Sequence, residues 1–265
     1  MKYKLGFIGC GNMGGALVKA AAKTVQAETI AVCDHNENKT TALQSELGVC
    51  PVSIRELAQE SKFIVLGVKP QRMQETLSEI ADVVQERTNV TLVTMAAGLS
   101  IAAIRSFVGA DAPVIRIMPN TPVTLGEGMT LYACEDVSKA DKKEFLHCFE
   151  KAGVFDKISE DKIDAASALS GCGPAYVYSF AEALANGAVE CGVEKEKADL
   201  YAAQTLLGAA KMLLAFGNPS DLIAAVCSPG GTTIAGMQAL EKAGFKNATL
   251  AAVHAAYQRT LELKK

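Results

Sequence analysis

The sequence lacks closely spaced cysteine and histidine pairs, the pattern typical of structural zinc sites. Its eight cysteines include no C-x-x-C pair, and the chain has only three histidines: His35, His147 and His254. Zinc ligands usually come as such close pairs. We therefore expect no metal, and we expect the cysteines to be reduced, mostly buried thiols of a cytoplasmic protein.

Long apolar runs and an excess of basic residues are also missing. No uncharged apolar run approaches the ~18–20 residues that span a bilayer, and the first residues, MKYKLGFIG, contain no signal-peptide core. The net charge is −3 and the pI is about 5.7. Surfaces that bind nucleic acid or anionic membranes favour positive charge. We therefore expect a soluble protein that binds neither nucleic acid nor a membrane.

The first part of the chain alternates short β-branched runs with segments of helical spacing. The expected strands are Lys4–Ile8, Thr29–Cys33, Phe63–Val68, Thr91–Met95, Val114–Met118, Met129–Cys134 and Val154–Lys157. The helical segments between them are Gly14–Lys23, Asn38–Glu46, Gln71–Val84 and Ile101–Phe107. This alternation predicts an α/β fold with a mostly parallel, Rossmann-type sheet that is covered on both faces.

After about residue 158 the pattern predicts helices alone. We expect them at Asp161–Leu169, Pro174–Cys191, Glu194–Phe216, Pro219–Val226, Thr232–Lys242 and Lys246–Leu263. This change predicts two domains, 1–158 and 159–265. The segment Leu200–Phe216 is apolar on nearly every side, which indicates a helix covered from several directions. A second subunit is the expected cover, so we predict a homodimer or a larger homo-oligomer joined through these helices.

A glycine-rich segment, GCGNMG, follows the first expected strand. It has the spacing G-x-G-x-x-G and precedes a helix, as a dinucleotide-binding loop does. In such a loop Gly9 would allow the tight turn, Gly11 the close approach of a pyrophosphate, and Gly14 the packing of helix on sheet. The alternative is a glycine turn of some other α/β domain.

Asp34 follows the second expected strand, where the adenosine ribose of a dinucleotide lies. Its carboxylate can accept hydrogen bonds from ribose hydroxyls and would repel a 2′-phosphate, which favours NADH. The polar residues that follow it, His35, Asn36, Asn38 and Lys39, could instead contact a phosphate. Alternatively, Asp34 caps the next helix.

Three more segments come at expected strand ends: VKPQ from Val68, MAAG from Met95 and RIMPNTP from Arg116. Ligands of open α/β sheets bind beyond the carboxyl ends of the strands. In the helical half, SPGGTTIAG from Ser228 places two glycines and two threonines where a helix begins. Free backbone amides and hydroxyls there predict an anion site. A simple N-cap at Thr232 is the plainer interpretation.

These motifs together closely resemble the pyrroline-5-carboxylate reductase family. FIGCGNMG, GVKPQ, MAAGLS, RIMPNTP, LSGCGPAY and CSPGGTTIAG stand in the family's order over the whole chain. The resemblance implies a Rossmann domain, a helical dimerisation domain and the last step of proline biosynthesis, in which pyrroline-5-carboxylate is reduced to L-proline with NADPH or NADH. It implies substrate binding by Glu160, Gly231, Thr232 and Thr233. It also implies cofactor binding by Ile8, Gly9, Cys10, Gly11, Asn12, Met13, Val68, Lys69, Pro70, Ala96 and Ala97, to which Asp34 is added from the argument above.

Three residues depart from the family pattern. Cys172 replaces a usual serine, Ser53 a common asparagine, and Asp34 a small hydroxyl residue. The third departure affects cofactor preference, so we expect NADH to be used well.

The reaction needs few catalytic side chains, since the cofactor transfers a hydride to the imine carbon and the ring nitrogen takes a proton. We expect the amides of Gly231 and Thr232 to bind the carboxylate and Thr233 Oγ1 to act as the catalytic hydrogen-bond partner of the ring nitrogen. A hydroxyl is a weak acid, so a protonated imine or a water relay is expected too. Tyr176 is a weaker donor candidate.

Rival interpretations are a different cyclic imine reductase, a β-hydroxyacid dehydrogenase and a non-enzymatic nicotinamide-sensing module. The dehydrogenase family carries a catalytic lysine on the helix after its glycine-rich segment, and Pro174–Glu190 contains none. The sensing module would need no substrate site like CSPGGTTIAG, so turnover of a cyclic imine distinguishes it from an enzyme.

Overall fold

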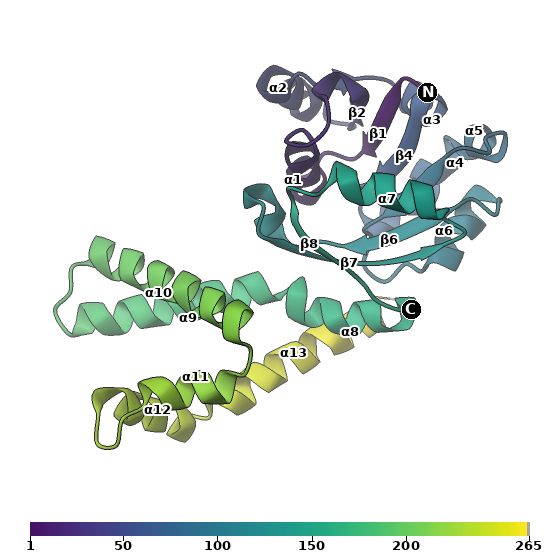
Figure 1. Ribbon diagram of the computed structural model, residues 1–265. Helices are drawn as coiled ribbons and strands as arrows, with labels where there is room; N and C mark the ends of the chain where they lie inside the picture. Colours follow the sequence, from purple (N-terminus) through teal and green to yellow (C-terminus); the bar gives the residue numbers. More distant parts are fainter. Residues whose placement is uncertain (264–265) are drawn as a thin grey trace. The chain divides into compact units, whose positions relative to one another are not determined.

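A computed structural model describes residues 1–263, and in that part of the chain eight strands form one sheet (Figure 1). The strand order is β3-β2-β1-β4-β5-β6-β7-β8. The strands are β1 (Tyr3–Ile8), β2 (Ile30–Cys33), β3 (Cys50–Pro51), β4 (Ser61–Leu66), β5 (Thr91–Thr94), β6 (Val114–Met118), β7 (Gly128–Glu135) and β8 (Gly153–Lys157). The first six strands are parallel, and β7 pairs antiparallel with β6.

The strand order reverses beside β1. The chain passes outward from β1 to β2 and β3, then returns to place β4 on the other side of β1. Loops that leave β1 and β4 therefore diverge at the carboxyl edge of the sheet, and the gap between them is where open α/β folds bind ligands. The glycine-rich segment follows β1 and lies at this point.

Helices cover both faces of the sheet, as expected. On one face, α1 (Asn12–Ala21), α2 (Glu37–Leu47) and α7 (Lys139–Cys148) pack on an apolar layer that includes Leu17, Leu43 and Phe145. On the other face, the layer includes Leu57, Leu77, Val83, Ile104 and Ile163. Those residues come from α3 (Ile54–Glu60), α4 (Met73–Ser78), α5 (Ala81–Gln85), α6 (Ile101–Val108) and α8 (Glu160–Ser170). Short 3-10 turns are Ala27–Thr29, Pro70–Arg72 and Thr121–Leu125.

The expected single helix over Gln71–Val84 is wrong, because a 3-10 turn, α4 and α5 occupy that segment. Arg55 Nη1 donates to the carbonyl oxygen of Glu79 at 3.1 Å. In a continuous helix that carbonyl would accept from the amide of Val83. The arginine replaces this helical hydrogen bond, and the chain turns between Ser78 and Ala81.

The short strand β3 and the helices α3 and α7 were not expected from the sequence. A signal for α3 was present, since Ser53 is its N-cap and accepts from the amide of Glu56. The helix α7 is rich in charge and buries only Phe145 and Cys148, so its apolar periodicity is weak.

The helical half contains α9 (Gly173–Glu190), α10 (Lys195–Phe216), α11 (Pro219–Val226), α12 (Thr232–Lys242) and α13 (Phe245–Glu262), close to the expected bounds. α9 and α10 approach closely through small side chains, those of Ala185, Ala198 and Ala202. Gly192 and Gly217 have positive φ values of 93° and 79°, and they lie just beyond the ends of α9 and α10.

The chain divides into two units by its internal contacts, and the division follows Cys172. Met1–Cys172 and the end of α13 from Ala256 form one unit, and Gly173–Ala255 form the other. The helix α8 belongs to the first unit because it packs on β7 and β6. Strands do give way to helices at residue 160, but the domain boundary at 158 stays a prediction.

The helix α10 exposes much of its apolar surface within this chain. Leu200, Leu207, Leu214 and Phe216 are exposed, Leu214 to 89%. The chain itself therefore does not cover this helix from several directions. No helix among residues 1–263 is long and apolar enough to cross a membrane.

Candidate functional site

Each of the three glycine positions in the first loop favours glycine for a different local reason. Gly9 has a φ of +95°, and its amide donates to the carbonyl of Cys33 at 2.8 Å. A Cβ on Gly14 would lie 2.1 Å from the carbonyl oxygen of Gly9, so no side chain fits there. A Cβ on Gly11 would meet nothing within 4 Å. Gly11 therefore leaves open backbone on the side where a pyrophosphate would approach.

The loop leads directly into α1, whose N-cap is Gly11, with no side-chain cap. The amide of Gly15 makes the first helical hydrogen bond, to the carbonyl of Gly11 at 2.7 Å. The first amides of a helix have no acceptor within it, and the positive end of its dipole lies there. Asn12 and Met13, both predicted cofactor residues, begin this helix.

Asp34 binds the glycine loop through its side chain, which is only 3% exposed. Its Oδ2 accepts from the amide of Cys10 at 2.7 Å, and its Oδ1 accepts from the amide of Asn36 at 2.9 Å. Lys39 Nζ is 3.4 Å from both oxygens. The alternative role as cap of α2 is wrong, because Asn36 caps that helix with its own side chain.

The hydrogen bonds to Asp34 lower its pKa. Burial alone raises the pKa of this carboxyl, but the amides of Asn36 and Cys10, helped by the Lys39 ammonium, outweigh burial and hold it below the usual value. At the neighbouring thiol burial also raises the pKa, and there the Asp34 charge adds to it, so the pKa of Cys10 rises to about 12.

A cleft of about 560 Å³ lies at the carboxyl ends of β1, β2 and β4. The predicted cofactor residues that line it are Ile8, Gly9, Gly11, Asp34, Val68 and Lys69. A second hollow of about 450 Å³, between α1 and α2, is lined by Cys10, Gly11 and Asn12 among others. The remaining predicted residues, Met13, Pro70, Ala96 and Ala97, line neither hollow.

Sequence reasoning missed several residues of the 560 Å³ cleft. Gly67 is one, and a Cβ there would lie 2.4 Å from the carbonyl oxygen of Gly9. Arg72, Thr76 and Glu79 also line the cleft. A glycine where the strand ends in VLGVK was the available signal for close backbone approach. Arg72, Thr76 and Glu79 come from the segment Gln71–Val84, which was expected to form one regular helix.

The loop after β5 carries Ala96 and Ala97 at the same edge of the sheet. The amide of Ala96 donates to Thr94 Oγ1 at 3.3 Å, and Ala96 is 3% exposed. In the next loop, Asn120 Nδ2 donates to the carbonyl of Ser170, and its Oδ1 accepts from the amide of Met129, both at 2.9 Å. Asn120 thus joins the end of β6 to β7 and α8.

Glu160, the first residue of α8, points its carboxylate at two protein donors. Its Oε1 accepts from the amide of Ile101 at 2.7 Å and from Arg116 Nη1 at 3.3 Å. Arg116 Nη2 donates to Asp164 Oδ1 at 2.5 Å. Arg116 and Asp164 were not among the predicted site residues. An arginine inside the strand VIRIM was the signal, because a charge in a buried strand needs partners.

The predicted substrate residues of the helical half lie where α12 begins. Gly231 is its N-cap, Thr232 and Thr233 are its first two residues, and both threonines are exposed. The amide of Gly231 donates to the carbonyl of Ser228 at 3.0 Å. The expectation that the Gly231 amide binds a carboxylate therefore needs correction. The amides at the start of the helix are those of Thr232 and Thr233. The hydroxyl of Tyr176 donates to the carbonyl of Ala252 at 3.4 Å, which fits a packing role.

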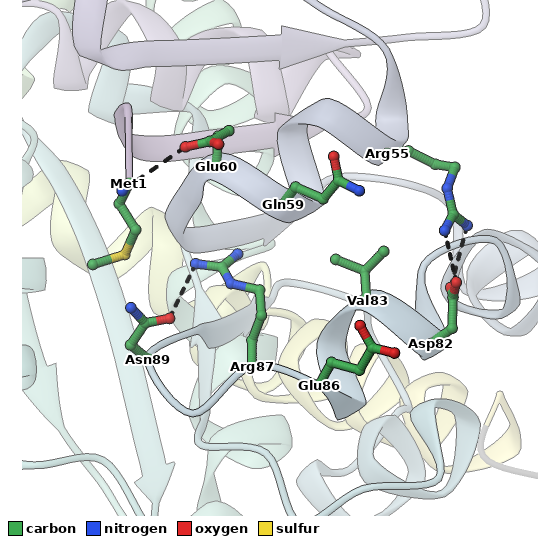
Figure 2. A pocket seen from close by; sticks show the side chains of 9 residues that line it. All are labelled: Met1, Arg55, Gln59, Glu60, Asp82, Val83, Glu86, Arg87 and Asn89. Carbon is green, nitrogen blue, oxygen red and sulfur yellow. Dashed lines mark hydrogen bonds and ion pairs between the residues drawn. The ribbon is translucent and has the colours of Figure 1, made fainter.

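Another hollow lies at the opposite edge of the sheet, around the amino ends of β1, β4 and β5. Its volume is about 390 Å³. Figure 2 shows Arg55 paired with Asp82, the N-terminal amine of Met1 with Glu60, and Arg87 with the neutral amide of Asn89. Arg55 Nη2 is 2.6 Å from Asp82 Oδ2, and the N-terminal amine is 3.8 Å from Glu60 Oε2. Arg87 donates to two neutral groups, the carbonyl of Ala58 and Asn89 Oδ1. The hollow is far from the dinucleotide edge in the parallel sheet.

Comparison with known proteins adds to this geometry. The family model described as "Pyrroline-5-carboxylate reductase dimerisation" matches residues 160–263, and "NADP oxidoreductase coenzyme F420-dependent" matches residues 4–98. Pyrroline-5-carboxylate reductase of Escherichia coli is 37% identical over 270 residues and covers 100% of both chains. Pyrroline-5-carboxylate reductase 3 of Danio rerio is 39% identical over 266 residues, 99% of this chain and 92% of that one.

The chain belongs to the pyrroline-5-carboxylate reductase family. Solved structures of family members agree with the fold of this reductase. The Plasmodium falciparum enzyme, with NADP bound, has a TM-score of 0.88 at 32% identity, and the Coxiella burnetii enzyme has 0.90 at 31% identity. Each comparison covers 100% of both chains. The expected combination of a Rossmann-type sheet with a helical second half is confirmed.

Among residues 1–263 of this reductase, no group of three or more His, Cys, Asp or Glu side chains is arranged to hold a metal ion. Of the residues expected to depart from the family pattern, Ser53 is the N-cap of α3 and Cys172 is exposed.

Replacing Gly14 with alanine should weaken dinucleotide binding strongly, because the new Cβ would lie 2.1 Å from the Gly9 carbonyl and displace the loop. We expect Kd for the dinucleotide to rise by roughly 100-fold or more, about 2.7 kcal/mol. Gly15→Ala is the matched control, since its Cβ would lie 3.6 Å from the nearest atom. Fluorescence titration measures both, and equal affinities for the two variants would contradict this account of the loop.

Asp34→Asn should destabilise the fold by about 1–3 kcal/mol at pH 7, because two backbone amides lose a charged acceptor. The pKa of Asp34 is lowered on folding. Its contribution is therefore complete above the unfolded pKa of about 3.9 and is lost as pH falls through the lower, folded pKa. Urea denaturation should show a difference between wild type and variant that is constant near neutral pH and shrinks below about pH 3.9. The exposed Asp111→Asn serves as control, and a pH-independent difference for Asp34→Asn would contradict the assignment.

Proposed function

We propose that this chain reduces 1-pyrroline-5-carboxylate to L-proline with a nicotinamide dinucleotide. The similarity to enzymes named for this reaction, over the full length of both chains, carries the proposal. The glycine loop supports it physically, because Gly11 presents open backbone at a helix start while Gly9 and Gly14 exclude side chains. These features suit a pyrophosphate.

The proposed cofactor residues are those at the carboxyl edge of the sheet. Amides at the start of α1 would bind the pyrophosphate. Asp34 would face the adenosine ribose, and Val68, Lys69, Pro70, Ala96 and Ala97 would contact the rest of the dinucleotide. When bound, the dihydronicotinamide supplies the hydride that the imine carbon accepts.

The proposed substrate residues are Glu160, Gly231, Thr232 and Thr233. The amides of Thr232 and Thr233 at the start of α12 would bind the carboxylate, since the helix dipole favours an anion there. Gly231 would keep the turn that places them, because its amide already bonds Ser228. Thr233 Oγ1 would accept from, or donate to, the ring nitrogen. A hydroxyl is too weak an acid to protonate the imine alone, so the proton reaches the nitrogen from water or comes with the substrate.

Homo-oligomerisation through the helical half belongs to the same proposal. The match of residues 160–263 to a dimerisation family and the exposed apolar side chains of α10 both support it. Exposed apolar surface of this extent is typical of protein–protein interfaces. We also propose that the enzyme acts in the cytoplasm, in keeping with its eight free cysteines.

Cofactor preference is the finer part of the proposal, and we propose that NADH is used well. Asp34 is held at the cleft by two amides, so its carboxylate stays near the position of the ribose. Two like unit charges ~4 Å apart repel by about 4 kcal/mol at an effective dielectric near 20. Lys39 offsets part of this repulsion from 3.4 Å away. We therefore propose that the enzyme also accepts NADPH, either less well than NADH or about equally well.

Thr233→Ala should lower kcat with pyrroline-5-carboxylate by roughly 5- to 150-fold, the loss of a hydrogen bond of about 1–3 kcal/mol. Thr233→Ser, which keeps the hydroxyl, should retain most activity. Optical assay of dinucleotide oxidation measures both. If Thr233→Ala keeps wild-type kinetics, Thr233 is not the hydrogen-bond partner of the ring nitrogen. A folded wild-type protein that oxidises neither cofactor with this imine would overturn the proposed function and leave the sensing alternative.

Lys39→Gln should reduce kcat/KM for NADPH by about tenfold, because the uncompensated Asp34 charge would then face the 2′-phosphate, while NADH should change little. Lys19→Gln is the control, since Lys19 pairs with Glu46 on the surface. The measurement is kcat/KM for both cofactors in all three proteins. A hundredfold preference of the wild type for NADPH would show that Asp34 does not face the ribose.

A further inference from the structure

Arg116 is the largest fully buried side chain in the described part of the chain, with 1% of its surface exposed. It lies in β6, in register with Thr94, the last residue of β5. The loop that follows Thr94 carries Ala96 and Ala97. A buried guanidinium is destabilising unless it is paired, and Arg116 has two carboxylate partners.

Both partners of Arg116 come from one helix. Glu160 and Asp164 are four residues apart and share one face of α8. Arg116 Nη1 donates to Glu160 Oε1 at 3.3 Å, and Nη2 donates to Asp164 Oδ1 at 2.5 Å. Asp164 is 2% exposed, and the side chain of Glu160 is 26% exposed. The fork of one arginine thereby fixes the first turn of α8 against β6.

The same oxygen of Glu160 reaches a second element. Glu160 Oε1 accepts from the amide of Ile101, the first residue of α6, at 2.7 Å. The segment 95–100 runs from Thr94 to Ile101, so both of its ends are held close to Arg116. Thr94 is held by strand register, and Ile101 by the carboxylate that Arg116 binds.

This segment lies where the nicotinamide end of a dinucleotide would be. The cleft that contains Asp34 runs from β2 across β1 to the loop after β4, and Asp34 lies at its β2 end, where the adenosine would bind. A dinucleotide that crosses the glycine loop extends from there toward β4 and β5. The loop after β5 is therefore the next part of the rim that it meets.

We propose that Arg116 is a positioning residue of this reductase, which through Glu160 holds segment 95–100 in the conformation that binds the nicotinamide end of the dinucleotide. The inference rests on the proposed function. Stability alone does not account for the cluster, because apolar residues of similar volume stabilise a core as well as buried ion pairs or better. What the cluster adds is a shared oxygen that ties the loop after β5 to the start of α8.

Arg116→Lys keeps the charge but removes the planar fork that binds two carboxylates at once. We expect Kd for the dinucleotide, measured without substrate, to rise about tenfold, or ~1.4 kcal/mol. Arg105→Lys is the matched control. Arg105 lies on α6 and, like Arg116, binds two carboxylates with its fork, those of the exposed Glu135 and Asp136 at 3.1 and 2.7 Å. Its replacement should lower stability and leave Kd unchanged.

A purely structural role for Arg116 would lower the thermal midpoint while Kd at a temperature well below that midpoint stays at the wild-type value. That result overturns the proposal. A wild-type protein that binds no dinucleotide would instead refute the proposed function, so the two failures are distinct.

Hydrogen exchange of the wild-type protein tests the same link if Arg116→Lys does not fold. Adding NADH should slow exchange at residues 95–101 and also in α8, through Arg116 and Glu160. The helix α7, on the other face of the sheet, is the internal reference and should change less. If NADH slows exchange at residues 95–101 but slows exchange in α8 no more than in α7, the proposal is overturned.

Discussion

The dinucleotide edge of this protein depends on a backbone contact that is too close for any side chain. Gly9, Gly14 and Gly67 meet where β1 ends, α1 begins and β4 ends, and a Cβ on Gly14 or Gly67 would lie 2.1 or 2.4 Å from the Gly9 carbonyl oxygen. Because the three segments touch through backbone alone, the first turn of α1 lies directly beyond β1. Asp34 adds to this contact by accepting from the amide of Cys10, which joins the end of β2 to the loop.

The sequence predicted what depends on local chemistry. The strand β6 and the helices α11 and α12 have their expected bounds, since β-branched runs, Pro219 and the glycines before Thr232 mark them. It did not predict what depends on distant partners. The break between α4 and α5 requires Arg55 on another helix to bind the Glu79 carbonyl. The Arg116 cluster joins residues 44 and 48 positions apart, and no local pattern indicates which carboxylates an arginine will find.

The proposed site residues show the same division. Ile8, Gly9, Gly11, Val68 and Lys69 line one cleft because parallel strands end at one edge, as the motif order led us to expect. The identity of the atoms that do the binding was harder to foresee. Gly231 uses its amide in a turn with Ser228, and Glu160 uses one oxygen on α6 and Arg116. Motifs name positions, whereas hydrogen bonds already made within the protein decide which groups stay available to a ligand.

The buried thiol of Cys10 has a consequence for the chemistry of the loop in the cell. Burial and the Asp34 charge raise its pKa to about 12, so the thiol form dominates at neutral pH. Peroxides and alkylating reagents attack the thiolate rather than the thiol. The cysteine of the glycine loop is therefore less open to oxidation than an exposed thiol of ordinary pKa. The carboxylate that accepts from the amide of residue 10 thus also adds, after burial, to the rise in the pKa of that residue's thiol.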